Sequence, residues 1–479
     1  MKFYLYTLLT SLLIFSCEKS KSDEGDYAYF GGEIINPSNN YVTLSNSNEE
    51  RDTIYLDKSN RFLYKVNSLK PGIFTFTHGG EYQTILLEAN DSLLIRLNTN
   101  DFDESLVYTG SGSKKNNYLI KSFLDDEIEN KEFNTIRHLE PEVFVEHMKK
   151  LRKQKLAHFE EFLSNKPSSK LFETIVRSSI DYNYYAYHEM FPFAYYGNNK
   201  LIHFKDLPDD FYDFRSEVDL NNEDLSKVYA YNRFLFWHFN NIALKQYYIE
   251  GHHEAFDRMA LDYNIEKLTL IDSTITNEKI KNYLLKHNIR DFVLNTDDRD
   301  ATITLINYYL ERSTNPDDKT YLKSLVESAS KLKPGRLLPD AELIDFNGNT
   351  VALSKLIDKP TVVYCWSSIY KMHSRNSHFK IKELKEKFPE VNFIAINFND
   401  NDLHYWKKTV RSLNYPLKNE YKFSNPSQAL DQYVITFSHK IFVVDKNMEI
   451  VNSNIELFND ELTECLEKMT ASSNKLSTK

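Results

Sequence analysis

Apolar runs alternate with helical periodicity over residues 341–472, and this alternation constrains the fold more than any other feature of the chain. Thr361–Trp366 and Val391–Asn397 are apolar runs typical of buried strands. Each precedes a segment with the apolar spacing of a helix, one from near Tyr370 to Phe388 and one from Asp402 to Leu413. Two such strand-helix units in succession predict a layered domain of mixed α/β structure.

Further elements complete this domain. A hairpin is expected within Ala341–Leu353, because Asn347-Gly348 is a strong turn signal. The elements expected at the C-terminal end are a helix at Ser427–Tyr433, strands at Ile441–Asp445 and Ile450–Asn454, and a helix at Asp460–Met469. The resulting order, strand-helix-strand-helix-strand-strand-helix, is that of a thioredoxin fold.

Three segments resemble TlpA/ResA-like thioredoxin domains. Lys333–Asp340 contains the Gly-x-x-x-Pro-Asp pattern that leads into the hairpin of such domains. Pro360–His373 has the frame of their active-site loop, and Ile441–Asp445 resembles their Thr-Phe-Leu-Ile-Asp strand. Residues 333–472 are therefore similar to a family whose members exchange thiols and disulfides through a pair of cysteines.

The resemblance assigns four positions to the redox site of the family, and no cysteine stands at any of them. Trp366 matches the tryptophan before the active-site loop, Tyr370 falls at the attacking cysteine, and His373 falls at the resolving cysteine. His439 stands where the family has its cis-proline. Thiol exchange needs one thiolate to attack a disulfide and a second thiol to resolve the mixed disulfide. We therefore expect a degenerate site with no catalytic residues and no redox activity.

Two cysteines within this domain leave an enzymatic alternative open. Cys365 lies in the buried strand and Cys465 in the last predicted helix. A reactive thiolate owes its low pKa to a partly exposed position, often at a helix N-terminus. We therefore interpret both cysteines as small buried hydrophobic residues. The alternative is a divergent thiol-disulfide oxidoreductase of the TlpA/ResA-like family with Cys365 as its nucleophile.

Two histidines of this domain form the candidate metal site. His373 and His439 map to facing positions in the related domains, with Tyr370 nearby. Copper sites in such folds use cysteines, whose softer sulfur selects that metal. Elsewhere, His252-His253-Glu254 lacks the His-Glu-x-x-His spacing that places two imidazoles on one helix face. We therefore expect polar residues in a vacated pocket, with no metal and no cofactor.

The N-terminus has the pattern of a bacterial lipoprotein. Met1-Lys2 supplies positive charge, and Phe3–Phe15 is an apolar run too short to span a bilayer but long enough for the core of a signal peptide. Ile14-Phe15-Ser16-Cys17 resembles a lipobox. The resemblance implies that residues 1–16 are removed as a signal peptide and that diacylglycerol is attached to Cys17. It also implies that a fatty acid such as palmitate acylates the new amino terminus. The alternative is an uncleaved signal anchor.

Residues 17–26 are polar and are expected to form a lipidated tether. Lys21-Ser22-Asp23-Glu24 resembles acidic signals that send some Bacteroidota-type lipoproteins to the outer face of the outer membrane, although a solvated linker has the same composition. We expect an outer-membrane lipoprotein of the cell envelope, periplasmic or surface-exposed, that contacts the membrane through its N-terminal lipid.

Residues 27–112 are predicted to form strands. Short β-branched and aromatic runs alternate with turn sequences such as Lys70-Pro71-Gly72 and Gly79-Gly80. The predicted strands are Tyr41–Leu44, Thr53–Leu56, Phe62–Tyr64, Gly72–Phe76, Gln83–Leu87 and Ser92–Leu97. This spacing favours an antiparallel β-sandwich. Thr109–Leu119 resembles the Gly-Ser-Gly turn and Asn-rich helix start that follow such a module in many Bacteroidota-type lipoproteins.

Residues 113–332 are predicted to be helical, because Phe144, Met148 and Leu151 begin a series of apolar residues at helical spacing. Tyr229–Phe239 and Asp181–Tyr196 are so aromatic that they must be buried, either in the core of this domain or in a groove for a partner. No repeat of about 34 residues is evident, so the sequence predicts no solenoid.

The whole chain is therefore predicted to be a multidomain α+β protein. It has an N-terminal antiparallel β-sandwich, a central all-α region, a C-terminal thioredoxin-like α/β domain and a flexible tail at 473–479. Its net charge of −10 argues against a nucleic-acid partner, which requires a concentrated basic face. We expect a redox-inactive binding or assembly module whose partner is a protein of the cell envelope.

Overall fold

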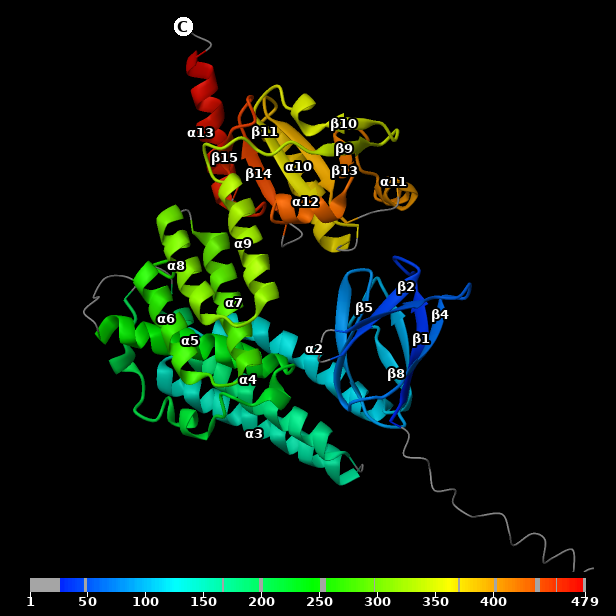
Figure 1. Ribbon diagram of the computed structural model, residues 1–479, viewed down its shortest axis with the longest axis vertical. Helices are drawn as coiled ribbons and strands as arrows, with labels where there is room; N and C mark the ends of the chain where they lie inside the picture. The colour runs from blue at the N-terminus through cyan, green and yellow to red at the C-terminus, as the bar shows by residue number, and fades with distance from the viewer. Residues whose placement is uncertain are drawn as a thin grey trace, which may run out of the picture. The chain divides into compact units, whose positions relative to one another are not determined.

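The computed structural model describes residues 26–46, 50–165, 168–197, 201–249, 256–296, 298–368, 371–399, 403–435, 440–453 and 455–476. The chain forms two compact units, whose elements are labelled in Figure 1. The first contains the residues up to 135 and residues 157–177, and the second contains 136–156 and 178–479. The helices α3 (Pro141–Asn165) and α4 (Lys170–Tyr196) contribute residues to both. The predicted domain boundaries after residues 112 and 332 stay predictions.

The first unit is built on a β-sandwich of two four-stranded sheets. Its strands are β1 (Ala28–Ile35), β2 (Tyr41–Ser45), β3 (Arg51–Tyr55), β4 (Arg61–Val66), β5 (Gly72–His78), β6 (Glu81–Leu87), β7 (Ser92–Asn98) and β8 (Val107–Ser111). One sheet has the order β4-β1-β7-β8 and the other the order β3-β2-β5-β6. Phe30 of the first sheet and Phe76 of the second lie 5.5 Å apart, ring centre to ring centre. The two sheets therefore share one core.

The sandwich differs from the sequence prediction in two strands and one pairing. The sequence pattern does not predict β1 or β8, and β1 pairs with β7 in parallel, so the sandwich is not wholly antiparallel. Both missed strands contain glycines at close backbone approaches. A Cβ atom at Gly32 would lie 2.2 Å from the Ile95 carbonyl oxygen, and one at Gly110 would lie 2.1 Å from that of Ser92. Glycine weakens a strand pattern in the sequence but permits these approaches.

Two consecutive asparagines near the start of α2 (Ser113–Ile136) pair with the edge strands of the sandwich. The side-chain amide of Asn116 accepts from the backbone N–H of Leu86 at 2.8 Å and donates to its carbonyl at 3.0 Å. Asn117 makes the same two hydrogen bonds with Tyr108, at 3.1 and 2.8 Å. Leu86 lies on β6, and Tyr108 lies on β8. Each amide therefore occupies backbone groups that a further strand could otherwise pair with.

The second unit begins with a helical region, which confirms the predicted helical character of this part of the chain. Its remaining helices are α5 (Tyr229–Ile249), α6 (Leu261–Thr274), α7 (Glu278–Asn295), α8 (Arg299–Arg312) and α9 (Pro316–Lys331). The short 3-10 turns before α5 are η1 (Phe204–Asp206), η2 (Asp213–Glu217) and η3 (Glu223–Leu225). Tyr231, Phe234 and Phe239 of the aromatic helix α5 are fully buried. They belong to the core, as the first of the two sequence interpretations expects.

Helices α6 and α7 form a hairpin that α8 and α9 repeat. The starts of α8 and α9 each lie 38 residues after the starts of α6 and α7. Asn277 and Asn315 are the N-caps of α7 and α9, and each side chain accepts a hydrogen bond from a backbone N–H of its helix. The pattern Thr-Asn-x-x-x-Lys at 276–281 recurs at 314–319. The sequence analysis misses this repeat.

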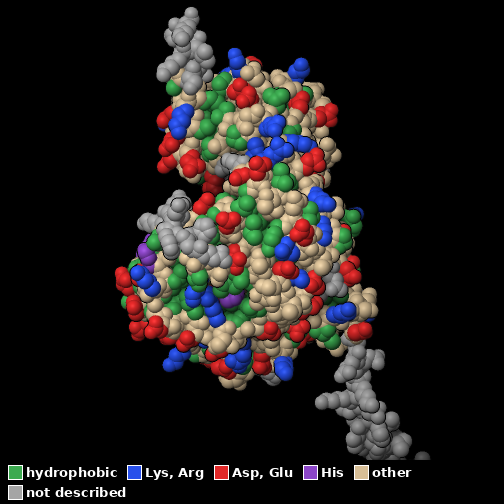
Figure 2. Space-filling view, turned by 60° about the vertical axis from the view of Figure 1, so that its left-hand side comes forward, with side chains coloured by type: hydrophobic (Ala, Val, Ile, Leu, Met, Phe, Trp, Pro, Cys, Tyr) green, Lys and Arg blue, Asp and Glu red, His purple; other side chains and the backbone are tan. Residues whose placement is uncertain are grey.

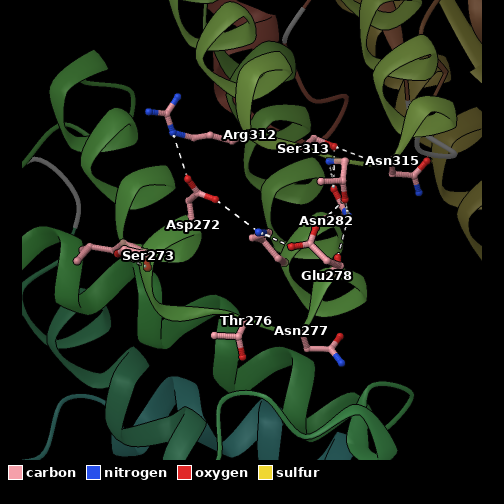
Figure 3. Close-up of polar contacts among 12 residues, drawn as sticks. Asp272, Ser273, Thr276, Asn277, Glu278, Asn282, Arg312, Ser313 and Asn315 are labelled. Carbon is pink, nitrogen blue, oxygen red and sulfur yellow. Dashed lines mark hydrogen bonds and ion pairs between the residues drawn. The ribbon is translucent and has the colours of Figure 1, made fainter.

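Polar side chains hold the two turns of the repeat in equivalent ways. The side-chain oxygen of Asn282 accepts from the Ser313 hydroxyl at 2.8 Å and from the Thr314 backbone N–H at 3.0 Å (Figure 3). In the other turn, the side-chain oxygen of Asn221 accepts from the backbone N–H of Thr276 at 2.7 Å. In both hairpins an amide from an earlier element thus fixes the threonine that precedes the N-cap.

The C-terminal part of the second unit contains a seven-stranded sheet. Its strands are β9 (Glu342–Asp345), β10 (Thr350–Ala352), β11 (Thr361–Trp366), β12 (Asn392–Asn397), β13 (Glu420–Phe423), β14 (Ile441–Val444) and β15 (Ile450–Asn452), in the order β10-β9-β13-β12-β11-β14-β15. β11 is parallel to β12 and antiparallel to β14. The central order β12-β11-β14-β15, with these directions, is thioredoxin-like, as the sequence predicts.

Helices cover both faces of this sheet. They are α10 (Lys371–Lys387), α11 (Leu403–Ser412), α12 (Pro426–Gln432) and α13 (Asp460–Leu476), with a 3-10 turn η4 (Leu353–Lys355) before β11. Tyr364 and Trp366 of β11 belong to a core shared with α10, α11 and α13. Tyr433, which follows α12, packs on Phe423 and Phe442. The sequence pattern misses β13, and α13 continues into the predicted tail.

None of the helices in the described ranges is both long and apolar enough to cross a bilayer. The predicted signal peptide and Cys17 lie outside the described residues. Figure 2 shows acidic and basic side chains over the drawn face, with several basic side chains close together in its upper half. The expectation of no nucleic-acid partner stays a prediction.

Candidate functional site

Two of the four predicted redox positions, Trp366 and His373, lie where β11 leads into α10. Trp366 ends β11 and is fully buried. His373 lies in the first turn of α10, where its Nδ1 is 3.3 Å from the Ser377 hydroxyl and its ring centre is 5.9 Å from that of Phe458. Tyr370 and His439 lie outside the described residues. Their positions relative to His373 therefore stay predictions.

Polar side chains hold the chain between β11 and α10. The backbone N–H of Ser368 donates to the side-chain oxygen of Asn399 at 3.0 Å, and the amide of Asn397 donates to the Ser368 hydroxyl at 3.0 Å. Ser368 and Asn397 are both buried. The carboxyl ends of the parallel strands β11 and β12 are thus joined by hydrogen bonds at the edge where the family has its reactive loop.

A buried cluster of His378, Glu420 and Tyr415 lies directly against Trp366. The imidazole of His378 stacks on the Tyr415 ring with 3.5 Å between their centres and 7° between their planes. Trp366 meets both rings edge-on, at 5.3 and 5.6 Å. The Tyr415 hydroxyl is 2.8 Å from that of Ser374, one turn before His378. We call these residues the His378–Glu420 cluster.

One proton is shared within this cluster. His378 Nδ1 lies 2.8 Å from the carbonyl oxygen of Ser374, which can only accept, so this nitrogen carries a hydrogen. His378 Nε2 lies 2.9 Å from Glu420 Oε1. The contact requires either a protonated carboxyl that donates to the imidazole or an imidazolium that donates to the carboxylate. Burial raises the pKa of Glu420, while its hydrogen bond with His378 lowers it.

The cysteine that the enzymatic alternative requires is buried. Only 2% of the surface of Cys365 is exposed, and burial raises the pKa of its thiol to about 12. Burial also raises the pKa of the half-buried Cys465. A thiolate that attacks disulfides needs a lowered pKa and access to the substrate. Neither described cysteine has these properties.

The two described cysteines also lie on opposite faces of the sheet. Val362, Tyr364 and Trp366 face the core that includes Cys465 of α13. Successive residues of a strand point to opposite faces, so Cys365 points away from that core. A disulfide brings the Cα atoms of its cysteines within about 7 Å, which this placement across the sheet excludes. These two thiols therefore cannot act as a pair in this fold.

Of this cluster, only the neighbouring Trp366 is predicted from the sequence, whereas His378, Tyr415 and Glu420 are not. The signal for His378 is its position four residues after Ser374 and three before Ile381, on the stripe of α10 that is buried. A histidine on such a stripe indicates a buried polar partner. Glu420 begins β13, whose mixed sequence Glu-Tyr-Lys-Phe has no clear strand pattern, so the partner could not be found from the sequence.

No group of three or more potential metal ligands occurs among the residues that the structure describes. His373 is one of the two predicted candidates, and its predicted partner His439 lies outside the described ranges, as does His252-His253-Glu254. The metal hypothesis therefore stays untested at these residues.

No known protein family matches the sequence, and no curated protein matches it. Solved structures do match. The thioredoxin domain of a thiol-disulfide oxidoreductase from Bacteroides vulgatus is 22% identical, with 29% of this chain and 97% of that chain covered and a TM-score of 0.25. A thiol:disulfide interchange protein from Bacteroides sp. is 22% identical, with 29% and 90% covered and a TM-score of 0.26.

A longer match is a thioredoxin-like protein from Bacteroides caccae. It is 13% identical, with 43% of this chain and 77% of that chain covered and a TM-score of 0.33. Each of these structures corresponds to less than half of this chain. The assignment of a thioredoxin-like fold rests on the strand order and strand directions of the seven-stranded sheet.

Proposed function

We propose that this chain is a membrane-anchored binding or assembly module of the cell envelope, with a redox-inactive thioredoxin-like domain. The observation that carries the proposal is the state of Cys365, which is buried and has a pKa raised to about 12. Its placement on the face of the sheet opposite Cys465 supports the same conclusion. The His378–Glu420 cluster fills the space next to Trp366 with packed rings, as a structural site requires.

The test is disulfide reduction by the purified protein. The wild type and the variant Cys365→Ser/Cys465→Ser are each incubated with a dye-labelled disulfide substrate and a thiol donor. We expect equal rates, because a thiol without a resolving partner cannot complete the exchange. If the wild type turned over the substrate and Cys365→Ser abolished this activity, the alternative would be established. That alternative, a divergent thiol-disulfide oxidoreductase, is supported only by the thioredoxin-like fold.

The anchor is tested separately at Cys17. The lipobox resemblance of residues 14–17 supports a lipid on this thiol, which would hold the protein at the outer membrane. In cells fed an alkyne-labelled fatty acid, we expect the label on the wild type and its absence on Cys17→Ser, which should leave the membrane fraction. Equal labelling of both proteins would overturn the proposed anchor.

The partner is proposed to be a protein of the envelope. Purification of the tagged chain in mild detergent, followed by identification of the proteins that accompany it, tests this point. We expect an envelope protein in an amount equal to that of the tagged chain. This protein should be washed away at high salt and should be absent when the same purification is made from cells without the tagged chain. Recovery of the chain alone would contradict a protein partner and favour a soluble ligand.

A further inference from the structure

One outer face of the β-sandwich is rich in tyrosine and threonine. Val42, Ile54 and Phe76 point into the core, so alternate residues of the sheet β3-β2-β5-β6 point outward. We define the Tyr-Thr face by the outward residues Tyr41, Thr53, Tyr55, Thr77, Tyr82 and Thr84. Tyr55 is 68% and Tyr82 is 66% exposed, which is high for aromatic side chains.

The face is continuous across all four strands. Thr53, Thr43, Thr77 and Tyr82 are directly paired neighbours on β3, β2, β5 and β6. Tyr55 pairs with Tyr41, and their rings lie 6.5 Å apart at 69°. Since neighbouring strands are spaced by about 4.8 Å, Tyr55 and Tyr82 stand on strands roughly 14 Å apart. Exposed rings thus lie on both edge strands of a hydroxyl-bearing surface.

The outer face of the other sheet shows that this composition is not a general property of the sandwich. There Arg61 pairs with Glu33, which pairs in turn with Arg96, and Lys65 pairs with Tyr29. These residues alternate with the core residues of their strands and point outward. In the paired rows of the Tyr-Thr face the single charged residue is Arg51, at the far end of β3. One face therefore carries mixed charges, and the other is essentially neutral.

A buried hydroxyl lies at the centre of the neutral face. Thr43 is paired between Thr53 and Thr77, and only 7% of its surface is exposed. Its Oγ1 makes no hydrogen bond to another described residue. A buried hydroxyl without a partner is costly, but this atom lies beneath the surface and is not itself presented to a ligand.

We propose that the Tyr-Thr face binds a neutral oligosaccharide. The C–H groups on one side of a sugar ring pack on an aromatic ring, while its hydroxyls exchange hydrogen bonds with the threonine and tyrosine hydroxyls. The spacing of Tyr55 and Tyr82 suits a ligand several sugar units long. The absence of charge favours an uncharged ligand, because an acidic polysaccharide or a nucleic acid requires basic groups.

The experiment is a calorimetric titration of the full chain, purified in mild detergent. The probes are neutral hexasaccharides of glucose, mannose and xylose, with hexagalacturonate as the charged comparison. The variant Tyr55→Ala/Tyr82→Ala removes both exposed rings, and Tyr55→Phe/Tyr82→Phe keeps the rings. Tyr229→Ala is the matched control, because Tyr229 is 72% exposed but lies on α5. All variants should keep the wild-type unfolding temperature, since the substituted side chains are largely exposed.

We expect at least one neutral hexasaccharide to bind, with its affinity reduced at least tenfold by Tyr55→Ala/Tyr82→Ala and unchanged by Tyr229→Ala. The Phe variant should keep most of the affinity. Three results would overturn the proposal: no binding of any neutral probe, binding that survives the double Ala variant, and preference for hexagalacturonate. Self-association of the wild type that the double Ala variant abolishes would assign the face to a second copy.

This inference rests on the proposed binding role but not on the redox inactivity of the thioredoxin-like domain. The two failures are distinguishable. A failed titration without disulfide turnover overturns only the oligosaccharide site. Disulfide turnover overturns the proposed function, but it does not change the conclusion that the titration gives about the oligosaccharide site.

Discussion

At the scale of single residues, Lys267 on α6 is a lysine buried without a carboxylate in hydrogen-bond contact among the described residues. Its side chain is 3% exposed, and its ammonium donates to the side-chain oxygen of Asn240 at 3.0 Å. The nitrogen also lies 4.8 Å from the centre of the Tyr263 ring. Burial lowers the pKa of Lys267 from 10.5 to about 7. The folded state therefore binds this proton less tightly than the unfolded state does.

We predict that Lys267→Met stabilises the protein and that the gain depends on pH. Below about pH 7 the lysine is charged in both states, so the full cost of burying the charge opposes folding. As the pH rises from about 7 to 10.5, this cost is lost and the wild type gains stability. The variant should gain roughly 2–4 kcal/mol in free energy of unfolding at pH 7 and much less at pH 10.

Urea unfolding at several pH values measures this difference. Lys323→Met on α9 is the control, since that lysine is exposed and its replacement should change stability little at any pH. A gain for Lys267→Met that is the same at pH 7 and pH 10 would contradict the lowered pKa.

Cys365 gives a second prediction at this scale. With a pKa of about 12, its thiolate fraction at pH 8 is roughly 10⁻⁴, and its side chain is buried. Alkylation by iodoacetamide at pH 8, followed by mass spectrometry, should be at least roughly 100-fold slower in the folded protein than in urea. The half-buried Cys465 serves as the internal comparison and should react faster. Equal rates for the folded and unfolded protein would contradict the burial of Cys365.

At the scale of elements, the asparagine pair of α2 covers two edge strands of the sandwich. Asn116 and Asn117 bind the backbone groups of two edge strands. We predict that Asn116→Ala/Asn117→Ala lowers the free energy of unfolding by about 2–5 kcal/mol, because four buried or partly buried backbone groups lose partners. Thermal unfolding followed by circular dichroism measures this loss.

We also expect this variant to aggregate, because its strand edges are exposed and can pair with other chains. Light scattering during the thermal ramp detects it. The control is Lys121→Ala, on the exposed side of the same helix. A double variant as stable and as soluble as this control would show that the asparagines do not protect the edges.

Elements with a strong periodic pattern are predictable from the sequence, and elements defined by their neighbours are not. Thr361–Trp366 is predicted with the bounds that β11 has, because a continuous apolar run has few alternatives. β13 has the mixed sequence Glu-Tyr-Lys-Phe, and it becomes a strand by pairing with β12 and β9. The His378–Glu420 contact depends on β13, so this part of the candidate site could not be predicted either.

At the scale of the whole molecule, the first compact unit includes more than the predicted sandwich. It contains α2 and the parts of α3 and α4 at 157–165 and 170–177. Four rings from these helices lie together within the unit. They belong to Tyr118, Phe159, Phe162 and Phe172, with ring centres 4.7–6.5 Å apart. The compact unit that contains the sandwich therefore includes helical segments that the sequence assigns to a separate domain.

We predict that a fragment of residues 26–112 fails to fold, whereas a fragment of residues 26–177 folds. The shorter fragment lacks the asparagine pair and the aromatic helices, so both strand edges and part of its apolar surface are uncovered. Circular dichroism during heating should show one cooperative transition for the longer fragment and none for the shorter one. Equal transitions would support the domain boundary after residue 112.

The paired helical hairpins have a consequence for how related chains can vary in length. Because equivalent caps recur after 38 residues, a duplication of this length would extend the stack without disturbing the turns on either side. An insertion of a single residue inside one of these helices would instead rotate the residues after it by about 100° and move them out of their packing positions. Sequences of close relatives, once aligned, should therefore differ over residues 261–331 by whole hairpins more readily than by single residues.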